Sequence, residues 1–285
     1  MGLSPYFQVL GSGAGDANFG TPDAAGLPLK DQRRNTGNYL TPDILIDFTD
    51  HTPGVLKEYG IDPSSIRYLL ISHGHFDHFQ PLEIIRFAAS LPHPLMVFGN
   101  SMVIDALELC RDTVYDEGTG RFVMHEEPYN LETEKLVLAD PVTVGAAKIT
   151  PLLGNHYMNK PYHIMEQQSL NFLIDTGHKK VFYGLDSSYM MPQTLALLNG
   201  THIDVAIMDA TFGAREIDPR VSGHHNWAML DETLDDLRRA GCIDDTTAII
   251  AAHLSCNNIG SHEQEAPEQA VKGITMAYDG LILPL

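Results

Sequence analysis

The residues best suited to chemistry are three histidines and one aspartate within a six-residue segment: His73, His75, Asp77 and His78. The segment directly follows the apolar run Ile66-Arg67-Tyr68-Leu69-Leu70-Ile71. Imidazole nitrogens and carboxylate oxygens are ligands that zinc, manganese and iron accept in proteins. The spacing therefore predicts a metal site at the end of a strand, and the alternative is a cluster of surface histidines without a metal.

Short apolar runs predict buried strands separated by helical patterns, which is an α/β arrangement. The expected strands are Tyr6–Leu10, Asp43–Phe48, Ile66–Ser72, Leu95–Gly99, Ala147–Leu153, Leu170–Asp175, Val181–Leu185, Val205–Asp209 and Ala248–Ala252. The expected helices are Leu82–Ala89, Ser101–Cys110 and Ala228–Ala240, the last followed by Gly241 as a C-terminal cap. Nothing in the middle of the chain has the composition of a linker, so we expect one domain over residues 1–285.

Polar residues recur where these strands end, at Asn155-His156, Asp186, Asp209 and His253. In α/β sheets, ligands bind beyond the carboxyl ends of strands. These side chains could therefore converge with the histidine motif on one edge. One histidine after a strand is weak evidence, but polar residues at the ends of several successive strands indicate a shared site.

The HxHxDH pattern resembles that of the metallo-β-lactamase superfamily of hydrolases, because the four residues of the motif match it at every position. The resemblance implies an αββα sandwich, in which two mixed sheets pack face to face with helices outside. It also implies two divalent metal ions. The first would be held by His73, His75 and His156, the second by Asp77, His78 and His253, and Asp186 would bridge both.

The metal would be zinc in the first place, with manganese or iron as alternatives, since the same ligands accept all three. Two such ions can share a water and lower its pKa towards neutrality, which supplies hydroxide as a nucleophile. We therefore count Asp77 among the catalytic residues as well as the ligands. Carboxylates that orient the imidazoles are also expected, and Asp47 is either one of them or an ordinary acid at a strand end.

The segment Gly223-His224-His225-Asn226-Trp227 is similar to one that opens a helix in phosphodiesterase branches of the superfamily, including tRNase Z and the phosphoribosyl cyclic phosphate phosphodiesterases. There the histidine protonates the leaving alkoxide or holds the phosphate. His224 aligns better with it than His225, and either could bind substrate. Alternatively, both are polar capping residues of the following helix.

Two further stretches, Val9–Gly15 and Arg33–Thr36, also resemble the cyclic phosphodiesterase group. The phosphonate-degrading members of that group bind a structural zinc through cysteines near the N-terminus. The stretch Asp16–Lys30 has no cysteine, so this chain departs from them and its substrate stays open.

The formal net charge of the chain is -19, from 18 basic and 37 acidic residues. Such a chain repels long polyanions unless it has a local basic patch. The pairs Arg33-Arg34, Lys179-Lys180 and Arg238-Arg239 are isolated and are expected on solvated faces. We therefore expect a small anionic substrate rather than a long nucleic acid.

The cysteines Cys110, Cys242 and Cys256 are far apart and form no CxxC pair, which is typical of a reducing compartment. Cys256 is expected to pack, and the alternative is a position near the second metal. With no apolar run long enough to span a membrane and no signal-peptide pattern, we expect a cytoplasmic protein without a membrane partner. Many relatives form pairs, so a homodimer stays open.

The preferred function is a metal-dependent phosphodiesterase that acts on a small cyclic nucleotide or sugar phosphodiester. A thioester or lactone hydrolase with the same motif is the alternative, although a thiolate leaves readily without an acid such as His224. A tRNase Z-type ribonuclease would need a basic arm, and the acidic stretch Asp116–Glu134 is a poor one. The filled ligand positions argue against a binding protein on a degenerate scaffold.

Overall fold

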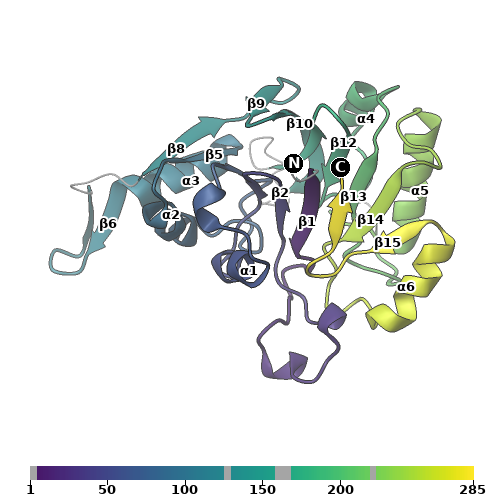
Figure 1. The fold of residues 1–285 in the computed structure, drawn as a ribbon, viewed down its shortest axis with the longest axis horizontal. Helices are drawn as coiled ribbons and strands as arrows, with labels where there is room; N and C mark the ends of the chain where they lie inside the picture. The colour runs from purple at the N-terminus through teal and green to yellow at the C-terminus, as the bar shows by residue number, and fades with distance from the viewer. Residues whose placement is uncertain (1–4, 125–129, 158–167, 219–222) are drawn as a thin grey trace.

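The computed structural model describes residues 5–124, 130–157, 168–218 and 223–285 and contains two large sheets (Figure 1). The first has the order β16-β1-β2-β3-β4-β5-β8, from β1 (Tyr6–Gly11), β2 (Gly37–Leu40), β3 (Ile44–Ile46), β4 (Tyr68–Leu70), β5 (Leu95–Gly99), β8 (Leu131–Lys135) and β16 (Ile282–Pro284). The second has the order β15-β14-β13-β12-β11-β10-β9, from β9 (Val142–Val144), β10 (Ala147–Tyr157), β11 (Gln168–Asp175), β12 (Lys180–Gly184), β13 (Val205–Asp209), β14 (Ala248–Ala252) and β15 (Ile274–Met276).

Helices cover the outer face of each sheet (Figure 1). The first sheet is covered by α1 (Thr52–Glu58), α2 (Pro81–Ser90) and α3 (Ser101–Asp112), and the second by α4 (Pro192–Leu198), α5 (Trp227–Arg239) and α6 (His262–Val271). Short 3-10 turns lie at Pro22–Ala24, Leu29–Asp31 and Pro63–Ser65. The expected four-layer αββα sandwich is confirmed, whereas the single domain over residues 1–285 stays a prediction.

Alternation of side chains along the strands explains the layers. In β3, Ile46 faces the core between the sheets, whereas Leu45 packs towards the helices of the first sheet. In β13, Ile207 belongs to the same central core, whereas Met208 packs in the cluster that includes α5. Both faces of each sheet are therefore apolar, and this burial holds the strands in register.

The parallel strands bring distant parts of the chain to one edge of the sandwich. Strands β3, β4 and β5 are parallel neighbours in the first sheet, as are β12, β13 and β14 in the second. His73 comes shortly after β4, Asp186 shortly after β12, and His253 directly after β14. The carboxyl ends of the strands therefore deliver the predicted ligands to a common place.

The expected strands and helices all form, most with ends shifted by a residue or two, but β10 differs. It continues to Tyr157, and its pairing with β11 is irregular between Leu153 and Tyr157. Asn155 and His156 therefore lie inside the strand rather than after it. The register irregularity is the reason, since extra residues in β10 let pairing resume beyond them.

The expectation of a solvated Arg33-Arg34 pair is wrong, since these residues are only 2% and 5% exposed. Arg34 forms ion pairs with Glu58 at 2.7 Å and with the buried Asp279 at 3.3 Å. Arg33 lies 3.6 Å from Asp31. Acidic partners compensate the buried charges, and those of Arg34 are distant in the sequence, so burial is tolerated here.

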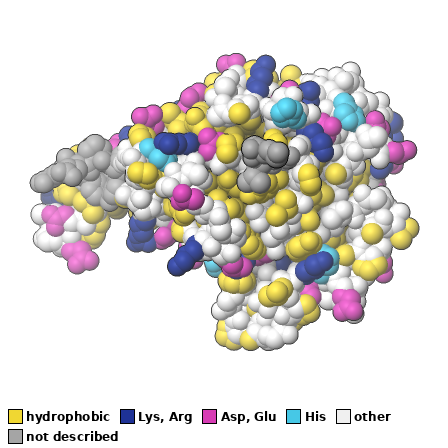
Figure 2. Space-filling view, viewed as in Figure 1, with side chains coloured by type: hydrophobic (Ala, Val, Ile, Leu, Met, Phe, Trp, Pro, Cys, Tyr) yellow, Lys and Arg dark blue, Asp and Glu magenta, His cyan; other side chains and the backbone are white. Residues whose placement is uncertain are grey.

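A two-stranded hairpin, β6 (Thr113–Asp116) and β7 (Arg121–Met124), projects from the body (Figure 1) and was not expected from the sequence. Hydrophobic side chains are visible on this projection (Figure 2). Phe122 and Met124 of β7 are both exposed. Among the helices of the described residues, none has both the length and the apolar character that crossing a membrane requires.

Candidate metal centre

The first cluster of predicted ligands consists of His73, His75, His156 and one oxygen of Asp186. The Nδ1 atom of His75 lies 2.9 Å from Nε2 of His73 and 2.9 Å from Nε2 of His156. The Oδ2 atom of Asp186 lies 3.5 Å from Nε2 of both His73 and His156. The four donor atoms lie within 4.8 Å of one another, a spacing that one divalent cation can bridge.

The second cluster consists of Asp77, His78 and His253, with the other oxygen of Asp186. Nε2 of His253 lies 3.1 Å from Nε2 of His78 and 3.3 Å from Oδ2 of Asp77. The Oδ1 atom of Asp186 lies 2.8 Å from Nε2 of His78 and 2.9 Å from Nε2 of His253. Asp186 thus presents one oxygen to each cluster.

The contacts of Asp186 indicate whether the two clusters are suited to a metal. Oδ1 of Asp186 is buried and accepts no hydrogen bond, although two ring nitrogens approach it within 2.9 Å. Those nitrogens are close, but no N–H is directed at the oxygen. Buried polar atoms nearly always have partners. A divalent cation satisfies a buried carboxylate oxygen that faces two imidazole nitrogens without a hydrogen bond, so the clusters are suited to divalent metals.

Burial and neighbouring charge shift the pKa values of the clusters. Burial lowers the pKa of His73 well below its usual range and that of His156 to about 3. Both rings are therefore neutral at neutral pH, which is the form that ligates a metal. Burial opposes the ionisation of Asp77, but His78 and His253 lower its pKa to about 2. The carboxylate is thus available as a ligand.

Three residues of the site have left-handed backbone conformations that are uncommon outside glycine: Asp47 (φ 60°), Asp186 (φ 45°) and His253 (φ 58°). Each lies just after a strand, following β3, β12 and β14 respectively. Such conformations cost of order 1–3 kcal/mol and persist where the surroundings enforce them. Here they turn the chain sharply at the strand end and direct the side chain into the site.

Asp47 orients one of the predicted ligands. Its Oδ2 atom accepts hydrogen bonds from Nδ1 of His78 and from the hydroxyl of Tyr183, both at 2.8 Å. Its Oδ1 atom accepts one from the backbone N–H of Ser72 at 2.8 Å. This contact agrees with the interpretation of Asp47 as a carboxylate that orients an imidazole, and it leaves Nε2 of His78 for the cluster.

Asp209, at the end of β13, holds His224 beside the second cluster. Oδ2 of Asp209 accepts a hydrogen bond from Nδ1 of His224 at 2.9 Å. The ring of His224 stacks on that of His253, with centroids 5.3 Å apart and planes 9° apart. The hydroxyl of Thr211 lies 2.7 Å from Nδ1 of His253 and also contacts Asp209. Sequence reasoning noticed Asp209 only as a strand-end acid and assigned it no role.

Asp209 and His224 also lie within ligand distance of Asp186 and His253, which allows a different grouping around a cation. The hydrogen bonds of Asp209 argue against this grouping. Both oxygens of Asp209 accept from Thr211, and Oδ1 also accepts from the backbone N–H of His225. We therefore assign Asp209 an orienting role.

His225 does not reach the site. It is 1% exposed, and its Nε2 atom lies 2.9 Å from the hydroxyl of Thr233 on α5. The expectation that His225 binds substrate is wrong, because its ring packs under the helix. Neither histidine caps α5, since the side chain of Asn226 accepts the hydrogen bond from the N–H of Met229.

A cavity of about 280 Å³ opens over the clusters. It is lined by Ala14, Gly15, Asp16, His75, Asp77, His156, Asp186, Thr211, His224, His253, Ser255 and Asn258. Asp279 anchors the stretch Val9–Gly15, since it accepts hydrogen bonds from the N–H of Ser12 at 2.8 Å and from the N–H of Arg34 at 3.0 Å. Cys256 is half-buried and does not line this cavity, in agreement with a packing role.

The model of the beta-lactamase superfamily domain matches residues 43–253, which include every predicted ligand. The chain belongs to the beta-lactamase superfamily. Together with the His/Asp clusters, membership indicates a metal-dependent hydrolase.

Solved structures of other proteins share the fold of this superfamily member. The metallo-beta-lactamase fold protein YhfI from Bacillus subtilis is 18% identical, with a TM-score of 0.70 and 99% of each chain covered. A diphosphatase from the PhnP family is 19% identical, with a TM-score of 0.70, covering 99% of this chain and 98% of its own. Human tRNase Z, short form, is 16% identical, with a TM-score of 0.64 and 98% of each chain covered. A comparison with curated proteins found no match.

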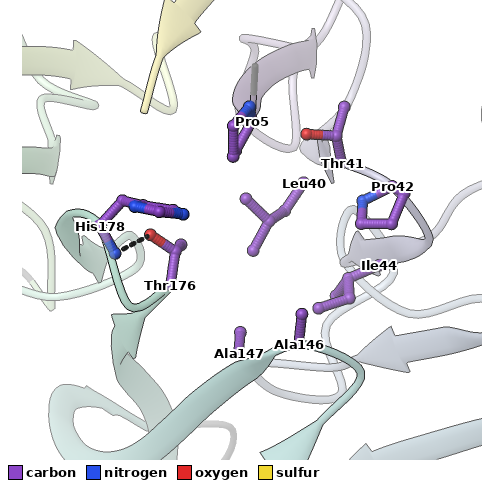
Figure 3. A pocket seen from close by; sticks show the side chains of 9 residues that line it. All are labelled: Pro5, Leu40, Thr41, Pro42, Ile44, Ala146, Ala147, Thr176 and His178. Atoms are coloured by element: carbon purple, nitrogen blue, oxygen red, sulfur yellow. Dashed lines mark hydrogen bonds between the residues drawn. The ribbon is translucent and has the colours of Figure 1, made fainter. Parts of the chain in front are cut away.

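A smaller cavity of about 130 Å³ lies at the opposite end of the sandwich, where β2 turns into β3 (Figure 3). Its lining is mostly apolar, with Leu40 and Ile44 facing Ala147 across it. Thr176 and His178 contribute the polar edge, and the hydroxyl of Thr176 accepts a hydrogen bond from the N–H of His178. This lining contains one histidine and no carboxylate, so it lacks the ligand clusters that border the other cavity.

Proposed function

We propose that this superfamily member hydrolyses small phosphodiesters, in a cavity built around two divalent cations. The observation that carries the proposal is His224, held by Asp209 against the second cluster and lining the cavity. A phosphodiester needs both electrophilic activation and an acid for its alkoxide leaving group. The two clusters and His224 offer these functions side by side.

In this proposal His73, His75 and His156 would hold the first cation, Asp77, His78 and His253 would hold the second, and Asp186 would offer one oxygen to each. Bound cations would supply Lewis acidity that activates water and neutralises charge on the phosphate oxygens. Asp77 lines the cavity as a carboxylate and can accept a hydrogen bond from the attacking water. Zinc is the first choice of metal, with manganese or iron as alternatives.

His224 acts as the general acid. Its Nδ1 atom is engaged by Asp209, so Nε2 is the nitrogen that can donate a proton inside the cavity. An alkoxide is a poor leaving group, and a positioned acid contributes about 10²- to 10⁴-fold to such a step. Hydrolysis of a thioester or lactone is the alternative function, and it gains little from His224 when a thiolate leaves.

The charge of the chain supports a small anionic substrate over long RNA. Lys and Arg side chains are scattered over the face in Figure 2 rather than joined in a track. The hairpin is a poor basic arm, since Arg121 is accompanied by Asp116 and Glu117. A tRNase Z-type activity is therefore the less favoured function. The cytoplasmic location and the homodimer remain predictions.

The test compares substrates with different leaving groups. Protein loaded with zinc or manganese is expected to hydrolyse bis(p-nitrophenyl) phosphate. His224→Ala should lower kcat about 10²-fold or more on diesters with alkyl leaving groups, and far less on p-nitrophenyl esters. His178→Ala, which alters an exposed histidine far from the clusters, is the control and should leave kcat unchanged.

Two results would contradict the proposal. Hydrolysis of thioesters or lactones without activity on any phosphodiester would favour the alternative hydrolase. Processing of a labelled tRNA precursor at physiological salt would instead favour the ribonuclease.

A further inference from the structure

Phe76 is an exposed aromatic residue at the mouth of the cavity. It stands between His75 and Asp77, which both line the cavity, yet its own side chain is 62% exposed. The Cζ atom of its ring lies 3.4 Å from the position that a Cβ atom on Gly15 would occupy. Because Gly15 also lines the cavity, the ring of Phe76 lies on the rim directly above it.

The turn that carries Phe76 is held in place by its neighbours. The backbone N–H groups of His78 and Phe79 both donate to the carbonyl of His75, at 3.0 and 2.8 Å. The side chain of Gln80 donates to the carbonyl of Phe76 at 3.1 Å. A ring on such a fixed turn loses little conformational freedom when a ligand packs against it, so an aromatic contact here is efficient.

The cavity is small for a site that binds a whole small-molecule ligand. Such sites measure roughly 300–1,000 Å³, and this one measures about 280 Å³. A phosphate group and its nearest atoms fit inside. A diester with a larger substituent can extend over the rim, where Gly15 has no side chain and Phe76 has an apolar face.

We propose that Phe76 is a specificity-determining residue that stacks on a planar aromatic ring, such as a nucleobase, attached to the phosphate that the clusters bind. This inference rests on the proposed function and narrows its substrate class from small phosphodiesters to those that carry an aromatic ring. Stacking of a base on an aromatic side chain contributes about 1–3 kcal/mol, which corresponds to roughly a 5- to 150-fold change in affinity.

The test measures binding rather than turnover. Calorimetry compares adenosine monophosphate with ribose 5-phosphate on the zinc-loaded protein, since ribose 5-phosphate has a hydroxyl group where the nucleotide has its base. The wild type is expected to bind the nucleotide at least about fivefold more tightly. Phe76→Leu should abolish this preference and leave affinity for ribose 5-phosphate unchanged, whereas Phe76→Tyr should keep the preference.

Phe122→Leu is the matched control, because Phe122 is also exposed, at 71%, but lies on the distant hairpin. It should keep the preference for the nucleotide. The inference is overturned if the wild type binds both ligands equally or neither, or if Phe76→Leu retains the preference.

Hydrolysis assays separate this inference from the proposed function. If bis(p-nitrophenyl) phosphate is hydrolysed but Phe76→Leu leaves the base preference intact, only the inference fails. If the preference depends on Phe76 but no phosphodiester is hydrolysed, the ring-binding role holds and the phosphodiesterase proposal fails.

Discussion

Oδ2 of Asp209 and Nδ1 of His224 are joined by a 2.9 Å hydrogen bond between a fully buried carboxylate and the wall of the cavity. Burial raises the pKa of Asp209, but His224 and His253 outweigh it and lower that pKa below its ordinary value. Asp209 is therefore ionised at neutral pH. It accepts the hydrogen bond from Nδ1 of His224, which leaves Nε2 as the nitrogen that can act in the cavity.

Asp209→Asn should weaken the acid without removing the ring of His224. We expect kcat on diesters with alkyl leaving groups to fall about 10- to 100-fold, because an orienting carboxylate is lost. Substrates with p-nitrophenyl leaving groups should lose far less, and Asp235→Asn on the exposed face of α5 is the control. An equal loss on both kinds of substrate would show that Asp209 acts through His253 and not through His224.

Asp47→Asn should weaken binding of the second cation. The substitution keeps the shape of the side chain but removes the charge that Nδ1 of His78 contacts at 2.8 Å. Loss of such a partner typically costs 10- to 100-fold in metal affinity. Calorimetric titration of this variant with zinc should show that one of two bound equivalents has a weakened affinity. Asp50→Asn, which alters a nearby exposed acid, should change the affinity of neither equivalent. Two unaltered equivalents would contradict the orienting role of Asp47.

Gly154→Ala should disturb the irregular part of β10 that positions His156. A Cβ atom at this position would overlap the hydroxyl of Ser169 and lie 2.8 Å from its carbonyl oxygen. We expect the free energy of unfolding to fall by about 1–3 kcal/mol, together with weaker binding of the first cation. Gly54→Ala is the control, since a Cβ atom there meets nothing within 4 Å. An unchanged free energy of unfolding in urea would contradict the close approach of Gly154 to Ser169.

His225 makes stability depend on pH in a defined window. Burial lowers its pKa to about 4 in the folded state, whereas the ordinary value of about 6.5 applies in the unfolded chain. Above pH 6.5 neither state binds this proton. Between pH 6.5 and 4 only the unfolded state takes it up, so stability falls as pH falls, by up to about 3 kcal/mol.

His225→Gln should remove this part of the pH dependence. Urea unfolding of the metal-free protein at pH 7 and pH 4.5 measures it, and the loss on acidification should be smaller in the variant than in the wild type. His202→Gln changes an exposed histidine and should behave like the wild type. If both variants lose as much stability as the wild type, His225 does not titrate in this range.

Most of the metal centre could be predicted because its ligands stand at strand ends that the apolar pattern marks. His73 to His78 follow a short buried strand, and Asp186 and His253 follow strands whose positions were predicted almost to the residue. His156 was predicted as a ligand but placed after its strand, because a register irregularity in β10 leaves no clear trace in the hydrophobic pattern.

The remaining features depend on contacts between distant residues. The bond between Asp209 and His224 joins residues of two segments, and only their folded arrangement brings them together. Arg34 is buried because Glu58 and Asp279 reach it, and neither partner is visible from the local charge pattern. Phe76 occupies a variable position of the motif, where spacing alone assigns no role.

The anchoring of Ser12 and Arg34 by Asp279 has a consequence for the protein as it is synthesised. The HxHxDH motif leaves the ribosome before Asp279, the residue that anchors the Val9–Gly15 stretch beside the cavity. Until Asp279 emerges, a nascent chain holds ligands that can capture a cation and lacks the anchored wall that defines the cavity. We expect metal capture to precede catalytic competence during translation, so that a stalled chain would be a metal-binding species without activity.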